Sequence, residues 1–142
     1  MNKLKKHYDE KGWVIYRNFF SSNEINKVNL IINNYLKKTI NFTNKKSRAI
    51  NFADDEKENV ENINSFHELA KCKEIKNLSK KKYVLNVARI FLGSDPDFRC
   101  CELFAKPAKL GLPSPDHQDN YYWAVKGSNA LTFWIALDNS NK

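Results

Sequence analysis

The most informative part of this 142-residue chain is the stretch PDHQDNYYW at residues 115–123, followed by LTFWIALD at residues 131–138. Its centre is His117-Gln118-Asp119. Residues two apart in a β-strand point to the same face, so a strand here would place His117 and Asp119 side by side. A neutral imidazole and a carboxylate that face the same space can bind one divalent cation, and Fe(II), Mn(II) and Co(II) suit such a pair.

Strands are expected on both sides of this motif. Residues 98–106 alternate in polarity and are rich in β-prone side chains, and the segments 117–123 and 130–138 have a similar character. Residues 107–115 hold three prolines and a glycine, so this segment is predicted to be a loop.

The first part of the chain predicts helices with clear ends. A polar helix at 3–11 should end at Gly12, and Ser21 and Glu24 have the spacing of a capping box that starts a second helix. This second helix should run to about Lys38, because apolar residues recur at spacings of three and four. Those residues are Ile25, Val28, Ile32, Tyr35 and Leu36.

Two more helices and two short strands complete the expected elements. The helices are predicted at 65–78 and at 80–92, the second of which should stop at Gly93. The strands are predicted at 13–16 and, within an otherwise polar loop, at 48–53.

Helices therefore come first and strands last, an order that predicts an α+β fold. We expect a single domain over residues 1–142, in which residues 1–95 form a mainly helical layer and residues 96–142 supply the first strands of a sheet. Hydrophobic residues make up 42% of the chain and aromatic residues 13%, which is enough for a folded core.

The net charge of +8 raises the question of an anionic partner. The basic residues are spread over the whole chain and are not interleaved with aromatics, so no nucleic-acid partner is expected. The three cysteines, Cys72, Cys100 and Cys101, lack the spacing of a disulfide framework. No apolar run follows residues 1–6 and no stretch has the length of a membrane span, so we expect a cytoplasmic protein with no membrane partner.

Several short motifs follow one another between residues 102 and 138. They are Phe104-x-Lys106-Pro107, Gly111, Pro115-x-His117-Gln118-Asp119, Tyr121-Tyr122-Trp123 and Leu131-Thr132-x-Trp134-Ile135-Ala136-Leu137-Asp138. In order, spacing and composition this segment resembles the phytanoyl-CoA dioxygenase (PhyH) family of Fe(II)- and 2-oxoglutarate-dependent oxygenases. The segment Gly12 to Ile15, Phe19-Phe20 and the capped helix after them are also similar to that family.

The resemblance implies a double-stranded β-helix, a jelly roll of about eight strands with helices packed outside. It implies that His117 and Asp119 are iron ligands. It places Gln118, Trp134 and Lys106 beside the co-substrate 2-oxoglutarate, although Lys106 has the alternative role of an exposed lysine at the end of a strand.

Tyr121, Tyr122 and Trp123 would line the mouth of the substrate pocket in such a fold, or else serve as core aromatics of a β-sandwich. The role of Glu102 stays open, because some relatives have an apolar residue there. The remaining histidines, His7 and His67, are assigned to helices outside the sheet and are not expected to bind the metal.

The family's third iron ligand is a later histidine, and a later arginine pairs with 2-oxoglutarate. Neither residue type follows Asp138 here. We therefore expect a truncated reading of a longer gene: the N-terminal portion of a dioxygenase that hydroxylates a small-molecule substrate with O₂, inactive as the isolated chain. The alternative is a non-catalytic jelly-roll-like binding module, or a half-domain that pairs with another chain. The sequence predicts neither the substrate nor the oligomeric state.

Overall fold

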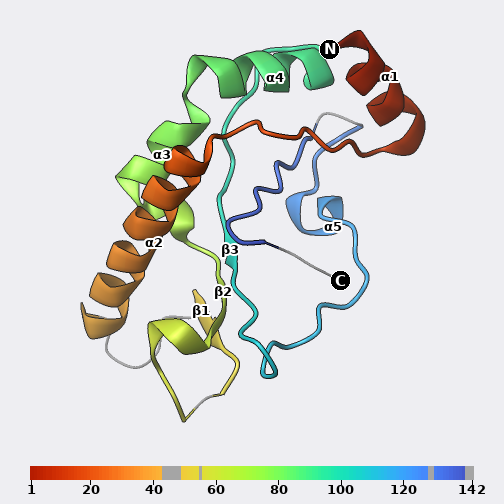
Figure 1. Ribbon diagram of the computed structural model, residues 1–142. Helices are drawn as coiled ribbons and strands as arrows, with labels where there is room; N and C mark the ends of the chain where they lie inside the picture. The colour runs from red at the N-terminus through yellow and green to blue at the C-terminus, as the bar shows by residue number, and fades with distance from the viewer. Residues whose placement is uncertain (43–48, 55, 128–129, 140–142) are drawn as a thin grey trace.

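The computed structural model describes residues 1–42, 49–54, 56–127 and 130–139 (Figure 1). The elements are α1 (Asn2–Lys11), α2 (Ser22–Phe42), β1 (Ile50–Phe52), the 3-10 turn η1 (Val60–Asn62), β2 (Ile63–Phe66), the 3-10 turn η2 (Leu69–Lys71), α3 (Lys73–Ser79), α4 (Lys82–Leu92), β3 (Leu103–Phe104) and α5 (Asn120–Trp123). Helices and one antiparallel sheet agree with the predicted α+β class. No helix among the described residues has the length and the apolar character of a membrane span.

The three strands form one antiparallel sheet with β2 at its centre. Ile50 pairs with Phe66 across β1 and β2, and Ser65 pairs with Phe104 across β2 and β3. The register shifts between Asn51 and Phe52, because Phe52 pairs with Ile63 and the pairing skips Asn64 of β2. Figure 1 shows α2 and α3 on one side of this sheet and α5, with the loop that leads to it from β3, on the other.

The core lies where α2 meets β2 and α3. Leu36 of α2 is 2% exposed, and Ile63 and Phe66 of β2 are 0% and 1% exposed. The other buried members of this cluster are Val28, Ile32, Ala49, Leu69, Cys72 and Ile75. The apolar face predicted for α2 is therefore confirmed, and each large side chain buried there stabilises the fold by about 1.5–3 kcal/mol.

The predicted capping box at the start of α2 is also confirmed. The backbone N–H of Glu24 donates to Ser21 Oγ over 3.3 Å, and the backbone N–H of Ser21 donates to Glu24 Oε2 over 3.0 Å. The helix runs past the expected Lys38 to Phe42, because no glycine or proline stops it and Ile40 packs against the core.

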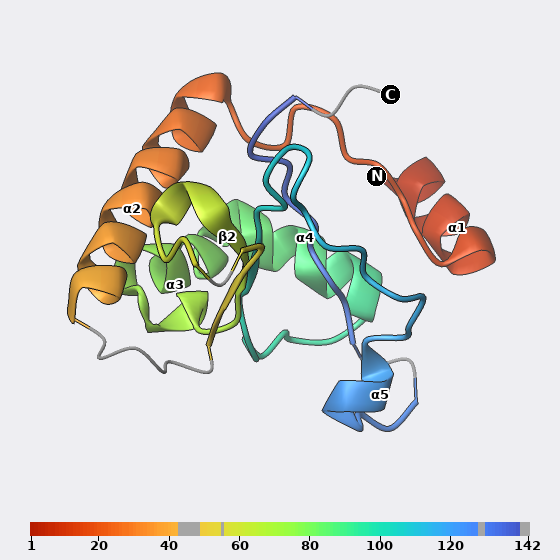
Figure 2. The ribbon, with the colours of Figure 1, turned by 90° about the horizontal axis from the view of Figure 1, so that it is seen from below.

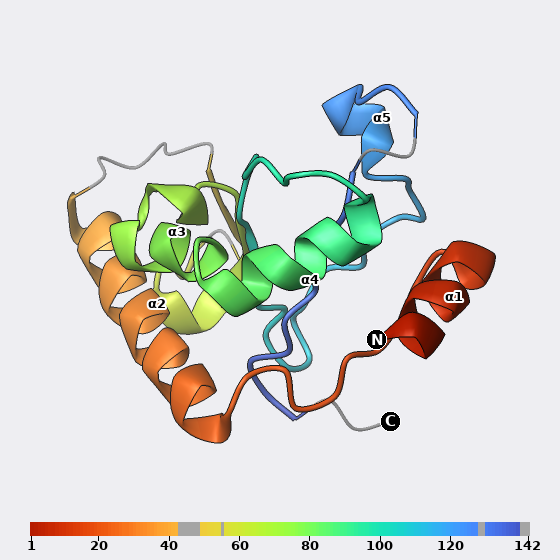
Figure 3. The same cartoon turned by 90° about the horizontal axis from the view of Figure 1, so that it is seen from above.

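Two glycines end α1 and α4 as the sequence predicts. Gly12 and Gly93 have φ values of 78° and 73°, in the left-handed region that glycine enters at little cost. Along α4, Val87 and Phe91 are buried, and the Phe91 ring meets the Tyr8 ring of α1 edge-on with centroids 5.0 Å apart. Figures 2 and 3 show α1 near one end of α4 and well apart from α2.

Two predictions in the first part of the chain are wrong. Residues 13–16 form no strand, and Trp13 and Ile15 are exposed, because a β-prone run is stable only beside another strand. The helix predicted at 65–78 is wrong in its first part, which forms the end of β2 and then η2. A short apolar run fits helix and strand alike, and here the burial of Phe66 between β1 and β3 decides for the strand.

The strand predicted at 48–53, whose first residue lies outside the described ranges, is confirmed as β1.

The strands predicted around the central motif are mostly wrong. In the segment 98–106 only β3 is paired, residues 117–123 contain the helix α5, and residues 130–138 form no strand. Strands need neighbours for their N–H and C=O groups, and the described strands form one three-stranded sheet. The jelly roll therefore stays a prediction.

Ser21→Ala is expected to destabilise the protein by about 1 kcal/mol, because the N–H of Glu24 loses its capping acceptor. The measurement is the free energy of unfolding in urea, followed by circular dichroism. Ser22→Ala is the matched control, since Ser22 is an exposed serine in the first turn of the same helix. Equal stability of the two variants would show that the cap does not stabilise α2.

Candidate functional site

His117 and Asp119 lie on the turn that leads into α5, and not on a strand. The backbone N–H groups of Tyr121 and Tyr122 donate to the carbonyl oxygens of Gln118 and Asp119, both over 3.0 Å. Nε2 of His117 lies 3.4 Å from Oδ1 of Asp119, so the two side chains are close. The expected proximity exists, but on an irregular segment that runs into α5 and not on a strand.

The imidazole of His117 is held in one tautomer. Its Nδ1 lies 2.8 Å from the carbonyl oxygen of Pro115. A carbonyl oxygen can only accept, so Nδ1 carries the hydrogen and donates it. In the neutral ring the lone pair is then on Nε2, the atom that faces Asp119.

The carboxylate of Asp119 is held from the side opposite to His117. Thr132 Oγ1 donates to Oδ2 of Asp119 over 2.9 Å, which leaves Oδ1 facing the imidazole. The two side chains are accessible, with 42% of His117 and 44% of Asp119 exposed. Nδ1 of His117 and Oδ2 of Asp119 are thus hydrogen-bonded within the protein, while Nε2 of His117 and Oδ1 of Asp119 face each other.

The donor atoms of this pair fit a divalent transition metal. Nε2 and Oδ1 are ligand atoms that suit Fe(II) and Mn(II), and atoms 3.4 Å apart can each lie about 2.1 Å from one cation. Metal-binding histidines and carboxylates usually have such hydrogen bonds on the atoms that do not bind the metal. The part of the chain that the structure describes contains no group of three or more His, Cys, Asp or Glu side chains that could hold a metal ion. The pair is therefore an incomplete ligand set, and its role as iron ligands stays a prediction.

The loop before the pair is attached to the sheet. Lys106 has a left-handed backbone with φ 42°, and a Cβ on Gly111 would lie 3.1 Å from the Cα of Lys106. The N–H of Gly111 donates to the carbonyl oxygen of Pro107 over 2.7 Å, and the N–H of Leu112 donates to Asn64 Oδ1 over 2.9 Å. Glycine at position 111 therefore allows the loop to fold back against the end of β3.

The three residues predicted to border 2-oxoglutarate lie in different parts of this region. Lys106 is exposed just after β3, Gln118 is exposed on the turn before α5, and Trp134 is exposed in the C-terminal segment. The Trp134 ring stacks on Phe104 with centroids 6.0 Å apart and an interplanar angle of 11°. The structure thus places Trp134 against the sheet, and the roles of all three residues stay predictions.

One of the three aromatic residues predicted to line a substrate pocket contacts the pair. The Tyr122 ring lies edge-on to the His117 ring, with centroids 5.9 Å apart. Tyr121 and Tyr122 are 85% and 66% exposed, so the alternative role as core aromatics is wrong for these two residues. Trp123 is half-buried.

A second polar cluster lies across the sheet and was missed by the sequence analysis. His67 was assigned to a helix outside the sheet, which is wrong because it directly follows β2. Its Nδ1 lies 3.3 Å from Glu102 Oε2, and its Nε2 lies 3.1 Å from Ser65 Oγ. Asn51 Nδ2 donates to Ser65 Oγ over 2.9 Å. The cluster links β1 and β2 to the segment before β3, and the signal for it was the strand alternation of Ser65 and His67.

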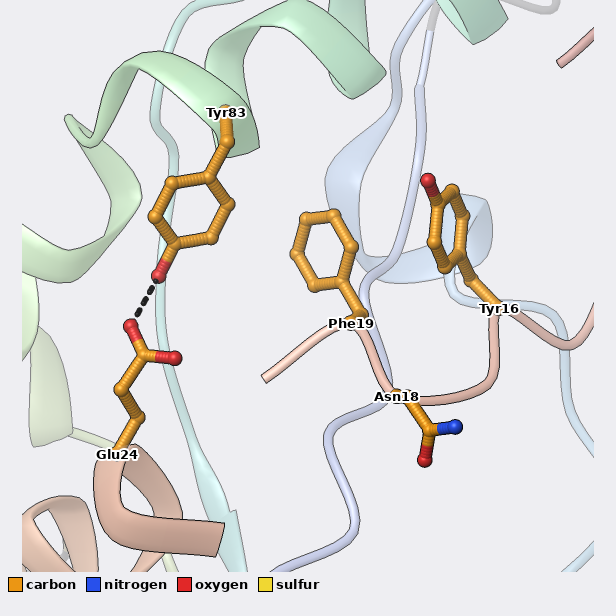
Figure 4. Close-up of a pocket in the computed structure, with 5 residues that line it drawn as sticks. All are labelled: Tyr16, Asn18, Phe19, Glu24 and Tyr83. Atoms are coloured by element: carbon orange, nitrogen blue, oxygen red, sulfur yellow. Dashed lines mark hydrogen bonds between the residues drawn. The ribbon is translucent and has the colours of Figure 1, made fainter. Parts of the chain in front are cut away.

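A cavity of about 350 Å³ lies between the segment before α2 and the start of α4 (Figure 4). It is lined by Tyr16, Asn18, Phe19, Glu24 and Tyr83. Glu24 Oε1 accepts from the Tyr83 hydroxyl over 2.9 Å and from Lys81 Nζ over 3.1 Å, while Oε2 accepts from Ser21. The one charged side chain in the lining is thus already paired on both oxygens, so its role is structural.

The family model described as Phytanoyl-CoA dioxygenase (PhyH) matches residues 8–142 of this chain. The matched range contains the sheet, the proline-rich loop, the pair of His117 and Asp119, and the segment that carries Thr132. Searches of curated proteins and of solved structures each gave no match.

Glu24→Gln is expected to remove a pH-dependent part of the stability. The backbone N–H of Ser21, then the Tyr83 hydroxyl and Lys81, lower the pKa of Glu24 from 4.5 to about 2. A carboxylate whose pKa falls on folding stabilises the protein above its unfolded pKa and loses this contribution as the pH falls through its folded pKa. The difference in melting temperature between wild type and Glu24→Gln should therefore shrink between pH 4.5 and pH 2.

The control for this comparison is Glu58→Gln, at an exposed glutamate. It should leave the melting temperature close to that of the wild type over the same range. A wild-type minus Glu24→Gln difference that stays constant down to pH 2 would contradict the assignment.

Gly111→Ala is expected to displace the loop, because the added Cβ would lie 3.0 Å from the Cβ of Lys106 and 3.1 Å from its Cα. Backbone atoms must then shift, and the hydrogen bond from Leu112 to Asn64 should weaken. We expect a destabilisation of about 1 kcal/mol and faster hydrogen exchange at the Leu112 amide. Ala108→Gly, in the same loop, adds no Cβ and is the control. Unchanged exchange at Leu112 in Gly111→Ala would refute the close approach.

Proposed function

The chain belongs to the phytanoyl-CoA dioxygenase (PhyH) family, and from this premise we propose that His117 and Asp119 are two iron ligands of an Fe(II)- and 2-oxoglutarate-dependent dioxygenase. The proposed reaction is the hydroxylation of a small organic substrate with O₂. The family's jelly roll and a cytoplasmic location belong to the same proposal.

The main observation for this proposal is the orientation of two atoms that can bind a metal. Nε2 of His117 and Oδ1 of Asp119 face each other across 3.4 Å, and Nδ1 and Oδ2 are already bonded elsewhere. With its hydrogen on Nδ1, the neutral imidazole has no Nε2 hydrogen to donate to Asp119, so Nε2 and Oδ1 can both bind a cation, whereas the imidazolium would form an ion pair with Asp119 instead. Two acceptor atoms directed at one point favour a cation between them.

The chain's own residues bind and orient in this proposal. Fe(II) with bound 2-oxoglutarate and O₂ supplies the oxidising power needed for an unactivated C–H bond. His117 provides a neutral nitrogen donor and Asp119 an anionic oxygen donor. Tyr122, edge-on to His117, would limit the access of water and contact the substrate.

Lys106, Gln118 and Trp134 are proposed to border the co-substrate. The ammonium group of Lys106 suits a carboxylate of 2-oxoglutarate, and the amide of Gln118 can donate to an oxygen. The indole of Trp134 is exposed and would add a flat apolar surface.

A second candidate function is non-catalytic binding by a module of the same fold. It is favoured by the ligand count, since the described residues contain two candidate ligands at this site and no larger group of His, Cys, Asp or Glu. The two candidates differ in the effect of 2-oxoglutarate on metal affinity. Tighter metal binding in its presence supports the enzyme, and no change supports the binding module.

His117→Ala is expected to weaken Mn(II) binding by more than roughly 100-fold. Loss of a residue that only hydrogen-bonds to a metal ligand already weakens metal binding by about 10–100-fold. Mn(II) replaces Fe(II) as a probe that does not oxidise in air. The measurement is the electron paramagnetic resonance signal of free Mn(II) during titration of the full chain, with and without 2-oxoglutarate.

His67→Ala is the matched control for this titration, since His67 is also a partly exposed histidine next to a carboxylate. It should bind Mn(II) like the wild type. If His117→Ala also matched the wild type, His117 would not be a ligand.

A further inference from the structure

Thr132 is joined to the candidate metal ligand Asp119 by a hydrogen bond across 13 positions of the sequence. Its hydroxyl donates to Oδ2 of Asp119 over 2.9 Å, from a segment that does not belong to the turn carrying the pair. The bond therefore connects two separate parts of the chain at the carboxylate itself.

The segment around Thr132 is positioned by contacts with the body of the protein. Leu137 packs against the core, and its carbonyl oxygen accepts from Asn29 Nδ2 of α2 over 3.0 Å. Trp134 stacks on Phe104 of β3. The segment is thus fixed to α2 and to the sheet, and it presents the Thr132 hydroxyl to Asp119 from that fixed position.

The hydroxyl group determines which carboxylate oxygen is free. An ionised carboxylate offers two equivalent oxygens, and a cation can use one or both of them. The hydrogen bond from Thr132 uses one lone pair of Oδ2 and holds the carboxylate with Oδ1 toward His117. A carboxylate held in this way favours binding through one oxygen.

We propose that Thr132 is a positioning residue for Asp119, which holds the carboxylate for binding through Oδ1 alone and thereby selects small transition metals over Ca²⁺. This inference rests on the proposed function. Ca²⁺ takes 6–8 oxygen ligands at 2.3–2.6 Å and often uses both oxygens of a carboxylate, whereas Fe(II) and Mn(II) accept a nitrogen and a single oxygen readily. Loss of the hydroxyl would free Oδ2 and remove this preference.

The experiment compares wild type, Thr132→Val and Thr132→Ser in Mn(II) titrations of the full chain, each repeated with Ca²⁺ as competitor. Valine has nearly the shape of threonine but cannot donate, and serine keeps the hydroxyl. Thr132→Val should bind Mn(II) about 10–100-fold more weakly, the usual cost of losing a residue that hydrogen-bonds to a metal ligand. Ca²⁺ should compete better with Mn(II) in Thr132→Val than in the wild type. Thr132→Ser should restore both the affinity and the selectivity.

Circular dichroism melts of the three proteins should agree, since Thr132 is exposed and valine preserves its volume. Wild-type affinity in Thr132→Val would overturn the inference, and so would equal losses in the valine and serine variants. The His117→Ala variant shows whether a negative result concerns only Thr132 or the proposed metal site as well. If His117→Ala loses Mn(II) while Thr132→Val keeps it, only the role of Thr132 is refuted. If wild type and His117→Ala do not differ, both proposals fail.

Discussion

The contact between the apolar face of α2 and the central strand β2 determines what each side of the sheet can do. Phe66 is buried beside Tyr35 of α2, with ring centroids 6.2 Å apart, so strand alternation turns Ser65 to the opposite face. On β3 the same alternation packs Leu103 against the core and leaves Phe104 on the other face. The sheet therefore has one apolar face against the helices and a second face with polar and aromatic side chains.

The face of the sheet that carries Ser65 and Phe104 positions the candidate site but provides none of its candidate metal ligands. Phe104 receives the Trp134 ring, and Asn29 of α2 holds the carbonyl oxygen of Leu137 beside the core. The C-terminal segment between these anchors carries Thr132, whose hydroxyl reaches Asp119. The geometry at the carboxylate thus depends on hydrophobic packing of α2 against β2, through a series of direct contacts.

The sequence predicted the elements whose signals are local. The capping box of Ser21 and Glu24 and the glycines that end α1 and α4 act within a few residues, and these predictions are confirmed. The short apolar run of β2 fits helix and strand alike, and its pairing with β1 and β3, far along the chain, decides for the strand. At the site, the spacing of His117 and Asp119 predicted their proximity for the wrong reason, because α5 replaces the expected strand. The contribution of Thr132 was hidden because it lies 13 positions after Asp119 in the sequence.

The two halves of the candidate ligand pair are oriented by different physical means. The carbonyl oxygen that accepts from His117 belongs to Pro115, two residues earlier in the chain, so this partner is set by the local backbone. The hydroxyl that binds Asp119 is set by packing of the C-terminal segment on the core. A disturbance of the core would therefore act on the carboxylate through the C-terminal segment, whereas the partner of the imidazole lies two residues away along the chain. The distance between Nε2 and Oδ1, and with it any affinity for a metal, is thus coupled to the core through the hydrogen bond from Thr132 to Asp119.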